Sequence, residues 1–380
     1  MGSVNIDNTG GGGDVTLSSN GTDLLLNGTA IGGGTALELY AENPGTFTAP
    51  SATGTNAVAI GTSASAGGSG GFASGNGATA SGTNSVALGR ANTASGQNSF
   101  AFGFSNTASA TYAVAIHGNA TADEAVAIGR NSSGNIAMAV TGHAAMALGG
   151  SYASGADSLA AAIANNTSSY GATGANSVAI GYQAKSTNSY GVALGAQAVA
   201  GQYAFAVGQG ALAEGRGSLA LGSGAKALQR NKFAFSGPWF SSVGDRQGGY
   251  LVLARDSSSE TPVVLTSSGG APATDNQIIL PNNSAYSFSG TIIAREQASA
   301  GSDYAAWEIK GAILRDGSAA TTVLGNGIKN SLYASAGAAA WDVSLTADTT
   351  NGGLAITVTG AAATNIRWVA TVNTSEVTYA

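Results

Sequence analysis

The chain of 380 residues contains no cysteine, so disulfide bonds, thiolate metal ligands and a cysteine nucleophile are all excluded. Charged residues are scarce as well, at 9% of the sequence, against roughly a quarter in ordinary globular proteins. No apolar run approaches the roughly 18 residues of a membrane-spanning helix, and the N-terminus lacks the basic and apolar regions of a signal peptide. We therefore do not expect a typical charged, helical enzyme, insertion into a membrane or export by the Sec route.

Proline and basic charge are also in short supply. Only 6 prolines occur, none of them between residues 51 and 237, and all four tryptophans follow that stretch. The net charge of -6 argues against binding to nucleic acid, which favours a basic surface. These shifts predict three segments, comprising residues 1–50, 51–237 and 238–380.

Glycine is abundant, with 58 positions, and in the middle segment it ends a repeated hexad of the form Asn-Ser-Val-Ala-Ile/Leu-Gly. Clear copies are NAVAIG at 56–61, NSVALG at 84–89 and NSVAIG at 176–181, and most copies follow one another after 12 to 14 residues. Two spacings depart from this, at 8 and 19 residues, and rungs there are expected to bulge or carry loops. The final position holds His117, Thr141, Ala162 or Ser236 in four copies, and in the clearest copies it holds Gly61, Gly89, Gly103, Gly129, Gly149, Gly181, Gly195, Gly208 and Gly222.

Each hexad has the period of a short β-strand. Val86 and Leu88 are two residues apart and share one face, while Ser85 and Ala87 share the other. We expect the larger pair to point into the core, as with Val178 and Ile180. The tract between hexads is long enough for a second short strand and two tight turns, so one 14-residue unit forms one rung of a solenoid.

Fourteen such rungs, stacked about 4.8 Å apart, would form a column of roughly 65 Å. A rung of two short strands has a thin core and leaves a largely apolar second face. The pattern thus predicts that neighbouring copies of the chain cover this face, although it does not give their number.

The hexad at 14-residue spacing resembles the head repeat of YadA-like trimeric adhesins over residues 56–236. The resemblance implies a left-handed parallel β-roll in which three chains pack side by side as a homotrimer. Cell-surface members of that family carry a signal peptide, a heptad stalk and a membrane-anchor barrel, none of which is readable here. The expectation is therefore a bacteriophage tail fibre or adhesin located in the virion, with a bacterial cell-surface adhesin passenger as the alternative.

The first segment is similar to fibre-shaft β-segments at residues 13–34, and it is expected to attach to a phage tail or baseplate protein. In the third segment, period-2 strands separated by turns predict an antiparallel β-sandwich or jelly roll, which resembles the globular tips of phage fibres. Three aromatic residues around the border between the second and third segments, Phe235, Trp239 and Phe240, are expected to cap the roll.

Candidate recognition residues lie in the third segment. The stretch 325–340 is longer than a hairpin needs and carries Lys329, Asn330 and Tyr333 outside any clear strand, so it is expected to be a loop that contacts the receptor. Trp307, Trp341 and Trp368 share strand faces with aliphatic residues and are expected in the core. The receptor would be a host cell-surface glycan or an outer-membrane protein.

No enzyme signature, cofactor motif or metal site is readable. The only two histidines, His117 and His143, are interpreted as solvent-facing rung residues, and the aspartates of the third segment as turn residues. The prediction is a non-enzymatic, all-β adhesin with no cofactor. A tailspike with a polysaccharide-degrading carboxylate pair between subunits remains an alternative, and an ice-binding roll lacks the regular Thr-x-Thr array it would need.

Overall fold

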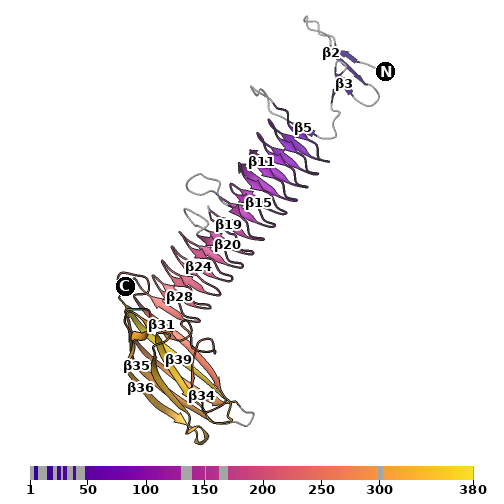
Figure 1. The fold of residues 1–380 in the computed structure, drawn as a ribbon. Helices are drawn as coiled ribbons and strands as arrows, with labels where there is room; N and C mark the ends of the chain where they lie inside the picture. Colours follow the sequence, from indigo (N-terminus) through magenta and orange to yellow (C-terminus); the bar gives the residue numbers. More distant parts are fainter. Residues whose placement is uncertain are drawn as a thin grey trace. The chain divides into compact units, whose positions relative to one another are not determined.

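The computed structural model describes residues 4–6, 15–19, 24–26, 29–31, 37–39, 48–129, 139–149, 151–161, 170–297 and 303–379 (Figure 1). These residues belong to two compact units, 1–117 and 118–380. All regular structure in the described ranges is β, apart from two single-turn 3-10 helices. The expected all-β class is confirmed.

The first unit begins with short strands. β1 to β4 form an antiparallel sheet in chain order, and β5 pairs in parallel with the first hexad strand, β7. Half of the predicted shaft segment, 13–34, lies outside the described residues. The bounds are β1 (Val4–Ile6), β2 (Val15–Ser19), β3 (Leu24–Leu26), β4 (Thr29–Ile31) and β5 (Leu37–Leu39).

Residues 51–117 form a parallel solenoid in which each rung contributes one strand to each of two sheets. The hexad sheet comprises β7 (Val58–Ile60), β9 (Phe72–Ser74), β11 (Val86–Arg90), β13 (Phe100–Phe104) and β15 (Val114–Ile116). The second sheet comprises β6 (Ser51–Ala52), β8 (Ser65–Ala66), β10 (Thr79–Ala80), β12 (Thr93–Ala94) and β14 (Thr107–Ala108). Successive hexads are in register, because Val86 pairs with Phe72 on one side and with Phe100 on the other.

The second unit continues the same pattern. Its hexad strands are β17 (Val126–Ile128), β19 (Met146–Leu148), β20 (Leu159–Ala161), β22 (Val178–Ile180), β24 (Val192–Leu194), β26 (Phe205–Val207), β28 (Leu219–Gly222) and β30 (Phe233–Ser236). Its short strands are β16 (Asn119–Ala120), β18 (Ala139–Val140), β21 (Gly171–Ala172), β23 (Lys185–Ser186), β25 (Val199–Ala200), β27 (Leu212–Ala213) and β29 (Lys226–Ala227).

The copy ending at Thr141 is not a rung of its own, which corrects the repeat count. Val126 pairs directly with Met146, so the spacings of 12 and 8 residues form one longer rung. Residues 139–140 belong to the short-strand sheet, where β18 pairs with β16. Ala162, at the end of the 19-residue spacing, lies outside the described residues.

The inward assignment of Val178 and Ile180 is wrong. Ala179 between them is fully buried in the roll, and its register partners Ala160 and Ala193 are buried as well, whereas the Ile180 side chain is 37% exposed. The two sheets lie so close that alanine fills the interior, and the larger side chains point outward. We call the third and fifth positions of the hexads the outward hexad face.

The corners that flank most of the described hexad strands use left-handed backbone. The nine predicted glycines of the final position all have positive φ, up to 129° at Gly195. A Cβ on Gly195 would meet the backbone of Gly208 on the next rung. The requirement for glycine at this corner is thus both conformational and steric.

Beyond the roll, the chain folds into two antiparallel sheets. The larger sheet has the order β31 (Arg246–Ser257), β39 (Ile366–Thr378), β34 (Ser284–Glu296), β35 (Tyr304–Arg315) and β36 (Thr322–Ala334). The smaller sheet places β38 (Gly353–Thr359) between β37 (Asp342–Asp348) on one side and β32 (Val263–Val264) and β33 (Ile278–Ile279) on the other. The 3-10 turns η1 (Ala319–Thr321) and η2 (Ala336–Ala338) precede and follow β36.

One apolar core fills the space between these two sheets, as expected for a sandwich. Trp307, Trp341 and Trp368 are all at most 5% exposed, and their ring centroids lie 5.6 and 5.9 Å apart around Trp368. The Trp368 indole N–H donates a 2.9 Å hydrogen bond to Ser257 Oγ. The predicted core role of these tryptophans is confirmed.

The roll and the larger sheet are joined by strand pairing within the second unit. The last hexad strand, β30, pairs antiparallel with β31, so that Phe233 lies opposite Tyr250 and Phe235 opposite Gly248. Figure 1 shows β31 continuing from the end of the roll into the C-terminal sheets. The border proposed near residue 237 is therefore crossed by a continuous hydrogen-bonded sheet.

Candidate functional site

The three candidate recognition residues lie on a strand, so the expectation of a loop is wrong. Lys329, Asn330 and Tyr333 belong to β36, an edge strand that is exposed over most of its length. Glycine and asparagine obscured the strand in the sequence, because neither residue favours β-structure. Recognition by these residues remains a prediction.

The structure separates the three side chains onto two faces of the sheet. Lys329 lies opposite the buried Ile309 and forms an ion pair with Asp342 of β37. Asn330 lies opposite Glu308 on the other face, where its amide donates a 3.2 Å hydrogen bond to the Glu308 carboxylate.

Tyr333 shares the face of Asn330 and stacks on Tyr304, with ring centroids 4.7 Å apart. Its pKa is raised, first by the hydrogen bond and charge interaction with Tyr304 and then by partial burial and the charge of Asp303. Asp303 itself accepts a 2.6 Å hydrogen bond from Ser335 Oγ. Only Asn330 and Tyr333 can therefore act together on one ligand.

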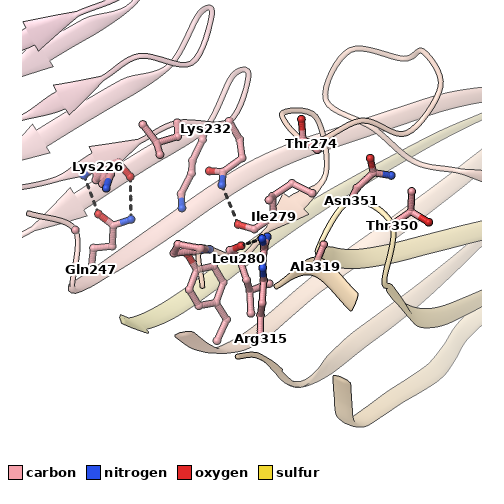
Figure 2. A pocket seen from close by; sticks show the side chains of 15 residues that line it. Lys226, Lys232, Gln247, Thr274, Ile279, Leu280, Arg315, Ala319, Thr350 and Asn351 are labelled. Carbon is pink, nitrogen blue, oxygen red and sulfur yellow. Dashed lines mark hydrogen bonds between the residues drawn. The ribbon is translucent and has the colours of Figure 1, made fainter. Parts of the chain in front are cut away.

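A pocket of about 300 Å³ lies between the last rungs and the C-terminal domain (Figure 2). Its apolar wall comes from Leu228, Ile279, Leu280 and Pro281, and Arg315 reaches in from the end of β35. Arg315 Nη1 donates a 2.6 Å hydrogen bond to the carbonyl of Leu280.

The polar groups of the pocket hold the two parts of the unit together. The Gln247 side chain accepts a 2.8 Å hydrogen bond from the backbone N–H of Lys226 and donates a 2.9 Å hydrogen bond to its carbonyl, both drawn as dashed lines in Figure 2. Gln229 donates a 2.8 Å hydrogen bond to the carbonyl of Ile279, and its Oε1 has no partner within the described residues. The pocket is therefore lined mainly by apolar side chains and by polar groups that form hydrogen bonds within the unit.

Beneath the pocket lies a buried ion pair. Lys232 Nζ lies 2.7 Å from the carboxylate of Glu376, and both side chains are at most 3% exposed. Gln247 and Thr374 donate further hydrogen bonds to the Glu376 carboxylate. Burial raises the pKa of the neighbouring Tyr286 well above its usual range, and the negative charge of Glu376 raises it further.

The three aromatic residues predicted to cap the roll occupy different settings. Phe235 points outward from β30 and is 58% exposed. Trp239 packs over Gly224 of the roll, while Phe240 is exposed and lies under the guanidinium of Arg246 at 5.2 Å. A capping role stays a prediction.

Asp245 organises the turn that follows Trp239. Its carboxylate accepts hydrogen bonds from the backbone N–H groups of Phe240, Ser241 and Ser242 at 3.0, 2.6 and 2.8 Å. Burial alone would raise the pKa of Asp245, but these hydrogen bonds outweigh burial and lower it.

The first hexad position forms a second surface feature, which we call the corner ladder. It adopts left-handed backbone on rung after rung, with φ of 54° at Asn176, 63° at Tyr190 and 55° at Tyr203. The rings of Tyr190 and Tyr203 stack with centroids 5.0 Å apart, and each side chain is 49% exposed. Sequence reasoning missed these tyrosines, although tyrosine at a position usually held by asparagine was a readable signal.

The two histidines differ in setting. His143 is exposed, as expected, whereas His117 is half-buried and lies edge-on to Phe102 at 6.3 Å. Within the described residues no group of histidine and acidic side chains could hold a metal ion. The same residues include no helix long and apolar enough to cross a bilayer.

Comparison with known families places the repeat. The model of the YadA head domain repeat (2 copies) matches residues 52–78, 66–92, 94–116, 172–198 and 200–225. No curated protein matches the chain significantly. The chain thus carries YadA-like head repeats, an adhesin-type and not an enzymatic repeat, arranged as a parallel β-solenoid.

Proposed function

We propose that the protein is a non-enzymatic adhesin that assembles as a homotrimer through its outward hexad face. The observation that carries this proposal is the orientation of the hexads. Alanine fills the roll, so Val, Ile, Leu and Phe line its outside, with Ile180, Phe205 and Leu221 between 37 and 41% exposed. A contiguous apolar surface of this kind marks an interaction site, and a closed rotational assembly covers it on every copy.

The apolar surface continues into the C-terminal domain, which supports the same assembly. The pairing of β30 with β31 places Tyr250 opposite Phe233. The row of outward-pointing side chains therefore continues from the roll onto the larger sheet. The face of the larger sheet on that side carries exposed Val252, Ile293, Val369 and Val377, where a solvated sheet face would be polar. Neighbouring copies would therefore pack along both the roll and the sheet.

We place this adhesin in a phage tail, with residues 1–50 attached to a tail or baseplate protein, 51–237 as a roll spacer and 238–380 as the receptor-binding tip. The YadA-like repeat and the sandwich that follows it suit a spacer and a tip. A bacterial surface adhesin is the alternative, and the repeat suits an exposed location in either case. Tail or baseplate genes beside the gene for this chain would support the phage assignment, whereas secretion and anchor genes would favour the cell surface.

Recognition of a host-surface glycan or outer-membrane receptor is expected to reside in the C-terminal domain, where aromatic and charged side chains lie on rigid strands. The test is binding of the fluorescently labelled full-length protein to host cells. Joint replacement of Lys329, Asn330 and Tyr333 by alanine is expected to abolish binding while the protein stays folded, because all three are exposed. Unchanged binding would show that the receptor site lies elsewhere.

A further inference from the structure

The corner ladder changes character where the roll meets the C-terminal domain. Tyr190 and Tyr203 stack on successive rungs, and the next ladder position is Gly217, with φ of 71°. Glycine carries no ring at this position, and a Cβ there would meet the side-chain oxygen of Asn231. Beside it lies an open hollow of about 430 Å³, lined by Tyr203, Arg216, Gly217, Arg230, Asn231, Ser267 and Ser268.

The backbone at the ladder makes tyrosine an unfavourable choice for folding alone. Left-handed φ is uncommon for bulky residues and is tolerated best by asparagine and glycine. Asparagine holds the same position at Asn84, Asn98 and Asn176, where Asn84 and Asn98 are bridged by a 3.3 Å hydrogen bond. Tyrosine at Tyr203 therefore accepts backbone strain and places half of an aromatic side chain in solvent.

The charges around the hollow are unequal. Arg230 forms an ion pair with Asp275, so its charge is compensated. Arg216 lies over the ring of Tyr203 at 5.2 Å and has no ion-pair partner within the described part of the chain. The hollow thus presents one uncompensated guanidinium beside an aromatic ring.

Hydrogen-bonding groups complete the lining. The Asn231 amide donates a 2.9 Å hydrogen bond to the carbonyl of Ser267, which fixes the carboxamide against the loop of the C-terminal domain. Ser268 Oγ accepts a 2.9 Å hydrogen bond from Asn276. Planar amide and guanidinium groups next to a tyrosine ring suit the hydroxyls and the apolar ring face of a sugar, and the free arginine suits an acid group.

In the proposed trimer, the ladder edge of the roll is expected to face solvent. Other rungs carry Glu124 and Asp157 at the same position, and acidic side chains there would be unpaired in an apolar interface. The outward hexad face, in contrast, is apolar on the described rungs apart from Ser74. The hollow therefore stays open in the proposed trimer.

We propose that this hollow is a binding site for an acidic saccharide, with the sugar ring against Tyr203 and its carboxylate on Arg216. The site rests on the proposed adhesin function and names its ligand class. It lies partly on the roll, so recognition is not confined to residues 238–380.

Saturation-transfer NMR on the full-length protein tests the proposal with six sugars. Glucuronic, galacturonic and N-acetylneuraminic acids are the acidic probes, and glucose, galactose and N-acetylmannosamine are the neutral ones. At least one acidic sugar is expected to bind. Every neutral sugar is expected to bind more weakly than that acidic sugar. Arg216→Gln should weaken that binding at least about tenfold, the effect of losing one charge-assisted hydrogen bond.

The chain offers a matched control for the aromatic ring. Tyr203→Asn and Tyr112→Asn both restore the usual ladder residue, so both variants are expected to fold, but Tyr112 is not among the residues that line this hollow. Tyr203→Asn should abolish the sugar signal and Tyr112→Asn should leave it unchanged. Absence of signal from all three acids, or equal effects of the two variants, would overturn the proposal.

The sugar assay is independent of adhesion and of assembly. If the protein binds an acidic sugar but does not attach to cells, the saccharide site is supported and the adhesin function is contradicted. If the protein attaches to cells and neither Tyr203→Asn nor the free acidic sugars affect attachment, the adhesin function is supported and the saccharide site is contradicted.

Discussion

Lys232 on the last rung of the roll forms a buried ion pair with Glu376 on the final strand of the chain, with Nζ 2.7 Å from the carboxylate. The two residues are 144 positions apart in sequence. Because β30, β31 and β39 are neighbouring strands, the pair ties the end of the roll to the C-terminal sheet.

Removing one partner of this pair should destabilise the second unit strongly. Glu376→Ala leaves Lys232 charged and buried, which is expected to lower the free energy of unfolding by about 3–5 kcal/mol. The double variant Lys232→Met, Glu376→Leu should recover most of that loss. Urea unfolding at equal protein concentration measures both, and a double variant as unstable as the single one would contradict the ion-pair account.

The interior of the roll should not tolerate a larger side chain. Ala179 is fully buried between the two sheets, so Ala179→Leu is expected to destabilise the roll by about 1–3 kcal/mol or more through overpacking. Thr187→Leu adds a comparable side chain at an exposed site nearby and is expected to have little effect. Equal melting temperatures of the two variants would show that the alanine core is not tightly packed.

The repeat allowed the roll to be predicted because period and spacing are properties of the sequence itself. The face of the hexad strand that points into the roll was not predictable in the same way. Alternation shows that Val178 and Ile180 share a face, but only the separation of the two sheets decides whether that face or Ala179 lies inside. The glycines and asparagines of the hexad indicate left-handed corners, but they do not give the distance between the two sheets.

The C-terminal domain shows a different limit. Its core tryptophans were predictable from strand alternation, whereas β36 was not, because Gly325, Asn326 and Gly327 favour turns and the strand is held by its pairing with β35. The ion pair of Lys232 and Glu376 depends on a tertiary contact that no local pattern reports.

The Asp245 turn should be sensitive to acid. Its folded-state pKa lies below the usual value of 3.8, so the ionised carboxylate stabilises the fold above that pH and the contribution is lost as pH falls through the folded-state pKa. Asp245→Asn is expected to reduce stability by about 1–3 kcal/mol near neutral pH, because an amide N–H would face backbone donors. Urea unfolding should show this difference at pH 7 and a smaller one near pH 3; a constant difference would contradict the assignment.

Charges on the outward hexad face should separate the subunits without unfolding the roll. Val178→Asp with Ile180→Asp places two carboxylates on a surface that is solvent-exposed in a single chain and buried in the proposed trimer. We expect a variant that keeps the β-rich circular dichroism spectrum but sediments more slowly than the native protein. Loss of the β signal would instead indicate that these side chains lie in the roll interior.

Sedimentation equilibrium of the full-length protein at micromolar concentration tests the central claim most directly. If the outward hexad face is a subunit interface, the mass will be three times the chain mass of 36.8 kDa and will persist on dilution. A folded species of 36.8 kDa would show that the roll and the larger sheet leave their apolar faces in water, and the account of this protein as a trimeric adhesin would be wrong.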